Sequence, residues 1–169
     1  MTDSKRKAPE IRRIVTGHDA KGKTIVWKDG PATVHQFPNE YRSSTILWVT
    51  DETPVDFSVD KDLTPEFVGT PPPEGGTRFS ILEIRPGGGT VPQVRAGTDT
   101  VDYIVCISGE LTLFLDDSSV TLKAGDTLIQ RGTHHGWANL GEVPARVAIV
   151  MVDGKPKRAG SIQRGKRAL

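Results

Sequence analysis

Short runs of apolar and β-branched residues alternate with turn-forming residues along most of this chain. Before residue 51 the two clearest runs are 24–27 and 44–49, and they are separated by Asp29-Gly30-Pro31 and by Pro38-Asn39. Their content of valine, isoleucine, threonine and tryptophan favours strands over helices. The acidic, proline-rich segment 51–77 shows no sustained period, so we expect a long loop there: a lid, an arm that packs on a partner, or a partly disordered stretch.

From residue 78 onward the expected strands are short and evenly spaced. They are 78–85, 101–107, 110–115, 120–123, 127–130, 135–138 and 144–152. Because no internal repeat, heptad or βαβ pattern occurs, the pattern predicts one all-β domain built as a sandwich or barrel. Four segments follow: a basic N-terminal tail (1–13), N-terminal strands with the proline-rich loop (14–77), the barrel core (78–153) and a basic C-terminal tail (154–169).

Composition and charge are compatible with this picture. The 169 residues include 36% hydrophobic and 25% charged residues, as is ordinary for one globular domain. The two tails hold eleven of the 22 basic residues but only two of the 21 acidic ones, so the body of the chain is acidic. The tails lack the interleaved aromatic residues typical of nucleic-acid binding. We therefore expect solvated ends, or arms that lie on an acidic neighbouring subunit.

The single cysteine, Cys106, excludes an intramolecular disulfide and fits a reducing compartment. The basic N-terminus is not followed by an apolar run, and no run approaches the length of a membrane span. We therefore expect a cytoplasmic protein with a small-molecule ligand or substrate, and neither nucleic acid nor membrane as a partner.

Two motifs with glycines at fixed spacing resemble motifs of a known protein family. The first runs Gly89-(x5)-Arg95-x-Gly97-(x4)-Asp102-(x6)-Gly109, and the second Gly125-(x4)-Gln130-x-Gly132-(x2)-His135-(x3)-Asn139. They resemble the two motifs of the cupin superfamily, and the stretches DYIVCISGELTLFLDD and LKAGDTLIQRGTHHGWAN resemble those of small single-domain cupins. The resemblance covers residues 78–153 and implies a cupin-type double-stranded β-helix, a jelly-roll barrel, here with an N-terminal strand extension.

The chain departs from the family pattern where the family binds metal. The resemblance implies a divalent ion held by two histidines and a glutamate of the first motif and one histidine of the second. Those positions are Arg95, Gly97, Asp102 and His135 here, and the usual proline of the second motif is Gln130. Since a metal site needs three or four converging ligands, we expect no cofactor; the alternative is one Fe, Mn, Zn or Ni ion held by His135 and Asp102 with other groups.

Strand alternation predicts which side chains share the barrel interior. If Asp102 points inward, Ile104 and Cys106 do too; if His135 points inward, Trp137 and Asn139 follow. We expect all six to line a small-molecule pocket, with Arg95 and Gln93 as further substrate contacts. Arg78, Tyr103 and Arg131 are expected outward or at the rim.

Asp102 and His135 are the expected catalytic pair. The carboxylate would fix the tautomer of the imidazole and raise its basicity, while Arg95 would neutralise a substrate carboxylate or enolate. The alternatives are purely structural roles. Asp102 would only accept hydrogen bonds from residues 98–100, His135 would be a structural donor, and Cys106 would be an inert buried thiol.

Three functions remain open at this point. The first, which we prefer, is a lyase or isomerase, for example a dehydratase or decarboxylase of a small oxygenated acid or polyketide-like compound. The second is a metal-dependent dioxygenase-type cupin, and the third is a binding module without catalysis. The resemblance also implies a homodimer in which residues 24–50 pair with the other subunit's sheet.

Overall fold

The computed structural model describes residues 7–89 and 97–155. Their regular structure is strands and one 3-10 helix, so the all-β prediction is confirmed. The elements are β1 (Arg12–His18), β2 (Thr24–Pro31), β3 (Val34–Asn39), β4 (Arg42–Thr50), the helix η1 (Thr64–Glu66), β5 (Thr77–Ile84), β6 (Thr100–Ser108), β7 (Glu110–Phe114), β8 (Ser119–Lys123), β9 (Thr127–Arg131), β10 (Gly136–Ala138) and β11 (Ala145–Asp153).

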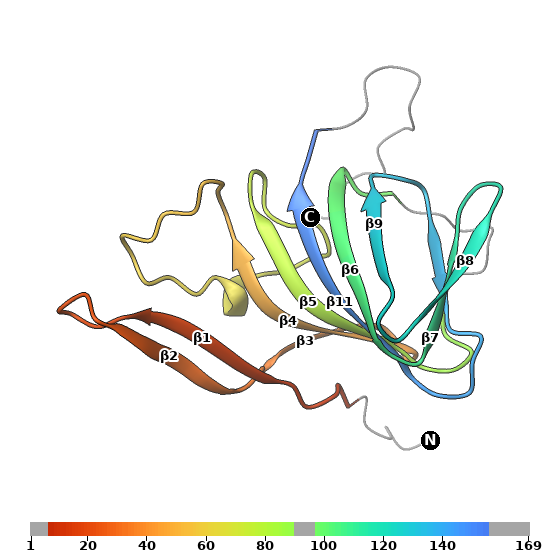
Figure 1. The fold of residues 1–169 in the computed structure, drawn as a ribbon, viewed down its shortest axis with the longest axis horizontal. Coiled ribbons are helices and arrows are strands. Elements are labelled where there is room, and N and C mark those ends of the chain that lie inside the picture. The colour runs from red at the N-terminus through yellow and green to blue at the C-terminus, as the bar shows by residue number, and fades with distance from the viewer. Residues whose placement is uncertain (1–6, 90–96, 156–169) are drawn as a thin grey trace.

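Two antiparallel sheets form the barrel (Figure 1). A six-stranded sheet has the order β3-β4-β5-β11-β6-β9, and a three-stranded sheet has the order β10-β7-β8. Neighbours in space that are distant in sequence, such as β5 beside β11 and β6 beside β9, are what the predicted jelly roll requires. The side chains that pack between the sheets are Ile84, Ile104, Cys106, Leu111, Leu113, Leu122, Trp137, Ala145 and Val147.

The register of the large sheet sorts its inner face into rows, because direct partners in antiparallel strands point to the same side. One row crosses five strands and contains Val49, Arg78, Met151, Asp102 and Gln130. The next row contains Ile46, Ser80, Ile149, Ile104 and Leu128. Three polar residues lie in the first row, while the rows beyond it are mainly apolar apart from Ser80, Ser44 and Arg42.

Two glycines close the barrel at points that no side chain would tolerate. Gly109, between β6 and β7, has φ +70°, and a Cβ there would lie 2.7 Å from the Pro144 carbonyl oxygen. Gly89 has φ +140°, and a Cβ there would lie 2.3 Å from the Trp137 carbonyl oxygen. Both are glycines of the first motif, so its spacing reflects backbone packing as well as chemistry.

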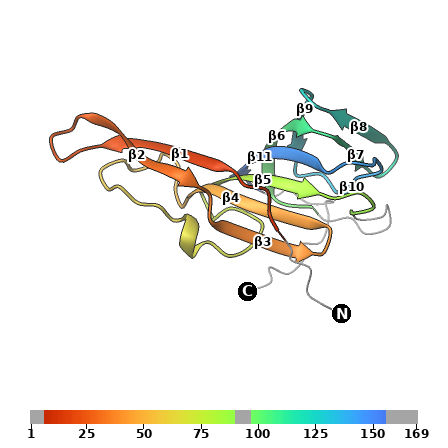
Figure 2. The same cartoon turned by 90° about the horizontal axis from the view of Figure 1, so that it is seen from below.

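An N-terminal hairpin of β1 and β2 extends away from the barrel (Figures 1 and 2). β1 begins at Arg12, inside the segment expected to be a tail, and the Arg12 guanidinium forms an ion pair with Asp29 at 2.7 Å. β1 and β3 were not predicted. Glycine, histidine and charged residues interrupt the apolar pattern of β1, and Pro38 interrupts that of β3.

Segment 51–77 is the long loop that the sequence predicts, and one buried carboxylate attaches it to the hairpin. Asp62 lies 3.0 Å from both Arg13 and Lys28 and accepts a hydrogen bond from the Thr64 amide. Burial alone would raise the pKa of Asp62, but hydrogen bonds from Thr64, Lys28 and Arg13 lower it to about 2. Beyond η1, the Phe67 ring lies over the guanidinium of Arg78, 5.8 Å from the ring centroid to Cζ, so the loop reaches the barrel.

Candidate functional site

A chain of hydrogen bonds joins Asp102 to His135 through Gln130. The Thr100 hydroxyl donates to Asp102 Oδ1 at 2.6 Å, and the Gln130 amide nitrogen donates to Asp102 Oδ2 at 2.8 Å. The same nitrogen lies 3.3 Å from His135 Nε2, and His135 Nδ1 lies 2.9 Å from the Thr133 carbonyl oxygen. The expected pair is therefore present, but Gln130 stands between its members.

The partners fix the proton positions along this chain. Asp102 accepts at both oxygens, as an ionised carboxylate does, so the amide nitrogen of Gln130 must face it. A backbone carbonyl only accepts, so His135 carries its proton on Nδ1 and donates it to Thr133. Nε2 is then the unprotonated nitrogen. The tautomer is set by Thr133 and Gln130, whereas the sequence predicted that Asp102 would set it directly.

Burial shifts both titrating groups toward their neutral forms. The pKa of Asp102 is raised mainly by burial, against hydrogen bonds from Thr100 and Gln130 and the charges of His135 and Arg78. The pKa of His135 is lowered mainly by burial, against the Thr133 hydrogen bond and the charge of Asp102. The positive charge of Arg42 lowers it further. Burial thus favours a neutral imidazole at His135, while the hydrogen bonds from Thr100 and Gln130 favour the ionised form of Asp102.

Two arginines of the inner face lie at opposite ends of the β4–β5 ladder. Arg42 is opposite Ile84, toward the closed end, and Arg78 is opposite Val49, in the row of Asp102. Arg78, expected outward or at the rim, is only 4% exposed, so that expectation was wrong. Its Nη2 donates to the Ser44 hydroxyl at 2.8 Å, and Arg42 Nη2 donates to the Trp137 carbonyl at 3.0 Å. The signal was present in the sequence: Arg78 alternates in period two with Leu82 and Ile84, which point inward.

The other predicted site residues have mixed roles. Ile104 and Cys106 point inward below Asp102 but belong to the apolar core, and burial raises the pKa of the Cys106 thiol, as suits an inert one. Trp137 is 7% exposed and its ring meets that of His135 edge to face, with centroids 6.3 Å apart. Arg95 and Gln93 lie outside the described residues.

Asn139 was expected to contact substrate, but its side chain forms hydrogen bonds with backbone groups. Its side-chain nitrogen donates to the carbonyls of Ile84 and Val143, each at 2.8 Å, and its oxygen accepts from the Gly141 amide at 2.9 Å. The residue is 0% exposed. It holds the turns at the closed end of the barrel together and has no hydrogen-bonding capacity left for a ligand.

The described residues do not fit the metal of the family pattern. Residues 7–89 and 97–155 contain no group of three or more histidine, cysteine, aspartate or glutamate side chains placed to hold an ion. Gly97, at one histidine position, has no side chain, and the amide hydrogens of Gln130 occupy the space between Asp102 and His135. The guanidinium groups of Arg42 and Arg78 would also repel a cation.

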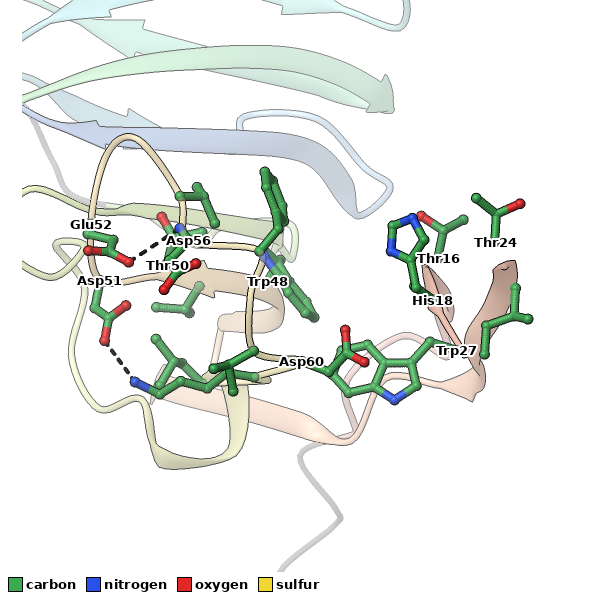
Figure 3. A pocket seen from close by; sticks show the side chains of 18 of the residues that line it. Thr16, His18, Thr24, Trp27, Trp48, Thr50, Asp51, Glu52, Asp56 and Asp60 are labelled. Carbon is green, nitrogen blue, oxygen red and sulfur yellow. Dashed lines mark hydrogen bonds and ion pairs between the residues drawn. The ribbon is translucent and has the colours of Figure 1, made fainter. Parts of the chain in front are cut away.

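A groove of about 830 Å³ lies outside the barrel, between the N-terminal hairpin and residues 48–63 (Figure 3). Trp27 and Trp48 stand edge to face in it, with ring centroids 6.3 Å apart. The carboxylates at its rim are exposed, and Asp51 is paired with Lys61 at 3.0 Å. We place the chemistry in the barrel, because the polar groups there are buried and incompletely paired, whereas those of the groove are solvated or paired.

The fold and the site define a small jelly-roll barrel with a polar interior at one end. Residues 80–153 match the Cupin_2 family, described as a cupin domain. Phomopsin biosynthesis cluster protein C' of Diaporthe leptostromiformis is 33% identical over 162 residues, which span 89% of this chain and 84% of that protein. The chain therefore belongs to the cupin superfamily, as the motifs indicated.

Two further similarities bear on the fold and the family. The cupin-domain-containing oxidoreductase virC of Hypocrea virens is 33% identical over 159 residues, covering 88% of this chain and 80% of that protein. The structure of KdgF from Halomonas sp. superposes with a TM-score of 0.50 at 14% identity, covering 73% of this chain and 88% of that one. Within the described residues, no helix is long and apolar enough to cross a membrane.

Proposed function

We propose that this chain is a small-molecule enzyme that catalyses proton transfer as a lyase or isomerase, with His135 as the base. One observation carries the proposal: the imidazole is half-buried and held in the tautomer that leaves Nε2 unprotonated. A base of this kind works best when its pKa lies near the operating pH. The relatives named for biosynthesis clusters support a role in secondary metabolism.

The proposed step begins when a substrate displaces the long 3.3 Å contact between Gln130 and His135 Nε2. A C–H proton next to a carbonyl group moves to Nε2, and its electron pair remains on the substrate as an enolate. The negative charge of Asp102 stabilises the imidazolium that forms. Returning the proton to another carbon completes an isomerisation, and giving it to a departing hydroxyl releases water.

Hydrogen exchange tests this step without knowledge of the natural substrate. We would incubate the protein with 3-oxobutanoate in D2O and follow loss of its α-proton signal by NMR. The wild-type protein is expected to accelerate the exchange, and His135→Gln to reduce the acceleration by about 100-fold or more, as is usual when a general base is removed. His18→Gln, a substitution of an exposed histidine, is the matched control. Equal acceleration by the His135 variant would overturn the proposal.

The pH profile gives a second reading of the same residue. A base must be unprotonated to accept a proton, and burial lowers the pKa of His135 below its ordinary value of 6.5. The exchange rate should therefore stay high at pH 6.5 and fall only in more acidic solution. Asp102→Asn removes a charge that raises this pKa, so it should move the fall to still lower pH.

An oxidoreductase is the second candidate, because virC and srdD, both about one third identical to this chain, are named cupin-domain-containing oxidoreductases. Metal analysis of the purified protein together with oxygen uptake would distinguish it from the first. A third possibility, a binding module without catalysis, would bind small acids but leave the exchange rate at its uncatalysed value.

We also propose that the chain forms a homodimer through its N-terminal extension. β3 is an edge strand of the large sheet, and apolar side chains on the hairpin and loop are exposed, including Val26 at 60% and Phe57 at 85%. Sedimentation should show a dimer that Val26→Glu with Phe57→Glu dissociates, while Val120→Glu on β8 leaves it intact. A wild-type monomer would contradict this.

A further inference from the structure

We propose that Arg42, Arg78 and Ser80 form a carboxylate-binding subsite inside the barrel, and that Gln130 accepts a hydrogen bond from a hydroxyl of the same ligand. The ligand class is thus a small hydroxy acid. This inference deepens the proposed function, on which it rests for calling that ligand the substrate.

The charges of the barrel interior do not balance. Arg42 and Arg78 both point to the inner face, and no carboxylate of the described residues lies within ion-pair distance of either guanidinium. Asp102 acts on Arg78 only as a more distant charge, and burial lowers the pKa of Arg78 to about 10, which leaves it charged at neutral pH. Glu83 is buried on the outer face of the sheet and is paired with Arg146 at 2.7 Å.

Unpartnered polar atoms show what the ligand would offer. Within residues 7–89 and 97–155, four buried side-chain atoms have no hydrogen-bond partner, and they are Arg42 Nε, Arg78 Nε, Ser80 Oγ and Gln130 Oε1. The first three are donors, and a carboxylate accepts from several donors at once. The fourth is an acceptor and requires an O–H or N–H. Since buried polar atoms are nearly always paired, four on one inner face favour a binding site over a packing defect.

The arginine side chains are held ready for such a ligand. Ser44 and the sulfur of Met151, at 2.8 and 3.5 Å, fix the two terminal nitrogens of Arg78, and the Phe67 ring lies over its guanidinium. The Trp137 carbonyl similarly fixes one terminal nitrogen of Arg42. Rotamers fixed before binding need not lose further freedom when the ligand arrives, so affinity benefits.

Gln130 relates the subsite to the proton-transfer residue. Its amide nitrogen already donates to Asp102 and lies against His135, so the position of its oxygen is determined. A hydroxyl that donates to this oxygen lies beside the imidazole. A ligand with its acid on the arginines and its hydroxyl on Gln130 therefore presents the carbon chain between them to His135.

The test uses calorimetric titration of the full-length protein with three probes: 3-hydroxybutanoate, butanoate and 3-hydroxybutanamide. The hydroxy acid should bind best, butanoate more weakly, and the uncharged amide not measurably. Arg78→Gln should weaken binding of the hydroxy acid by about tenfold or more, the usual effect of losing a charge-assisted hydrogen bond. Arg131→Gln, which makes the same change of charge at an exposed position, should not.

Ser80→Ala keeps the test decisive if Arg78→Gln fails to fold. The Ser80 hydroxyl has no hydrogen-bond partner in the free protein, so its removal should leave the melting temperature unchanged or raise it. The same substitution should weaken the binding of 3-hydroxybutanoate. A purely structural serine would not separate stability from binding in this way. Equal binding of the acid and the amide, or unchanged affinity in Ser80→Ala, would overturn the subsite.

His135→Gln separates this inference from the proposed function. If the variant still binds 3-hydroxybutanoate while hydrogen exchange is lost, the subsite and the proton-transfer role of His135 are both supported. If the wild-type protein binds the acid but catalyses no exchange, the subsite holds and the proton-transfer role fails. If it catalyses exchange that depends on His135 but shows no preference for the acid over the amide, the subsite fails and the proton-transfer role holds.

Discussion

Replacing Asn139 by alanine is expected to lower the free energy of unfolding by about 3–5 kcal/mol, although no ligand contact is lost. The substitution removes three hydrogen bonds at a residue that is 0% exposed. It leaves the buried Ile84 carbonyl without this donor, which costs about 1–3 kcal/mol. The Val143 carbonyl and the Gly141 amide, which belong to exposed residues, each lose a hydrogen bond worth about 0.5–1.5 kcal/mol. Urea denaturation with an unchanged m-value is the measurement.

The matched control for this prediction is Asn39→Ala. Asn39 is exposed and makes one comparable side-chain hydrogen bond, accepting from the Tyr41 amide at 2.9 Å. Its loss should lower the free energy of unfolding by less than about 1 kcal/mol, because water replaces the bond. Near-equal effects of the two substitutions would mean that Asn139 does not hold the closed end of the barrel together.

Asn139 also shows what motif spacing can and cannot reveal. The second motif places this asparagine correctly, four residues after the pattern's histidine, and alternation predicts that it points inward. Its hydrogen-bond partners come from the end of β5 and from residues 141–143, and no local pattern announces that these segments meet. The sequence therefore predicts a buried amide but not whether that amide serves a ligand or the backbone.

The same distinction applies to the barrel interior. The fold, most strand positions and the inward direction of Asp102, Ile104 and Cys106 follow from period-two alternation and turn residues. Arg78 was misplaced because arginine is usually exposed, and its burial depends on Ser44 and Met151, contributed by two other strands. Gln130 was noted only as a departure from the motif, and its bridging position depends on the pairing of β9 with β6.

These features together suggest why the barrel tolerates loss of the family's ligand pattern. The glycines and Asn139 that shape the backbone remain, while the ligand positions hold Asp102 and His135 without their usual companions. In their place, the structure shows a buried arginine, Arg78, a half-buried one, Arg42, and an amide bridge on the same inner face. The barrel interior would thereby suit an anion instead of a cation. The negative charge of Asp102 limits how tightly that anion binds.

Asp102→Asn is accordingly expected to lower the free energy of unfolding by about 1 kcal/mol in dilute buffer, because hydrogen bonds to a charged group are stronger than those to a neutral one by about that amount. Asparagine matches aspartate in shape. It can still accept from Gln130, and it can donate to Thr100 if that hydroxyl turns toward Thr98, 2.6 Å away. The substitution therefore mainly removes charge, leaving the guanidinium group of Arg78 without the negative charge that acts on it.

Added formate identifies the cause of that destabilisation. An anion that binds only the folded state stabilises it in proportion to its occupancy, so formate should recover part of the lost stability in Asp102→Asn and bind that variant more tightly than wild type. Asp117→Asn, with the same change of charge at an exposed turn, should show neither effect. If Asp102→Asn were as stable as wild type, or indifferent to formate, the arginines would not need a counter-ion, and the anionic ligand inferred above would lose its electrostatic basis.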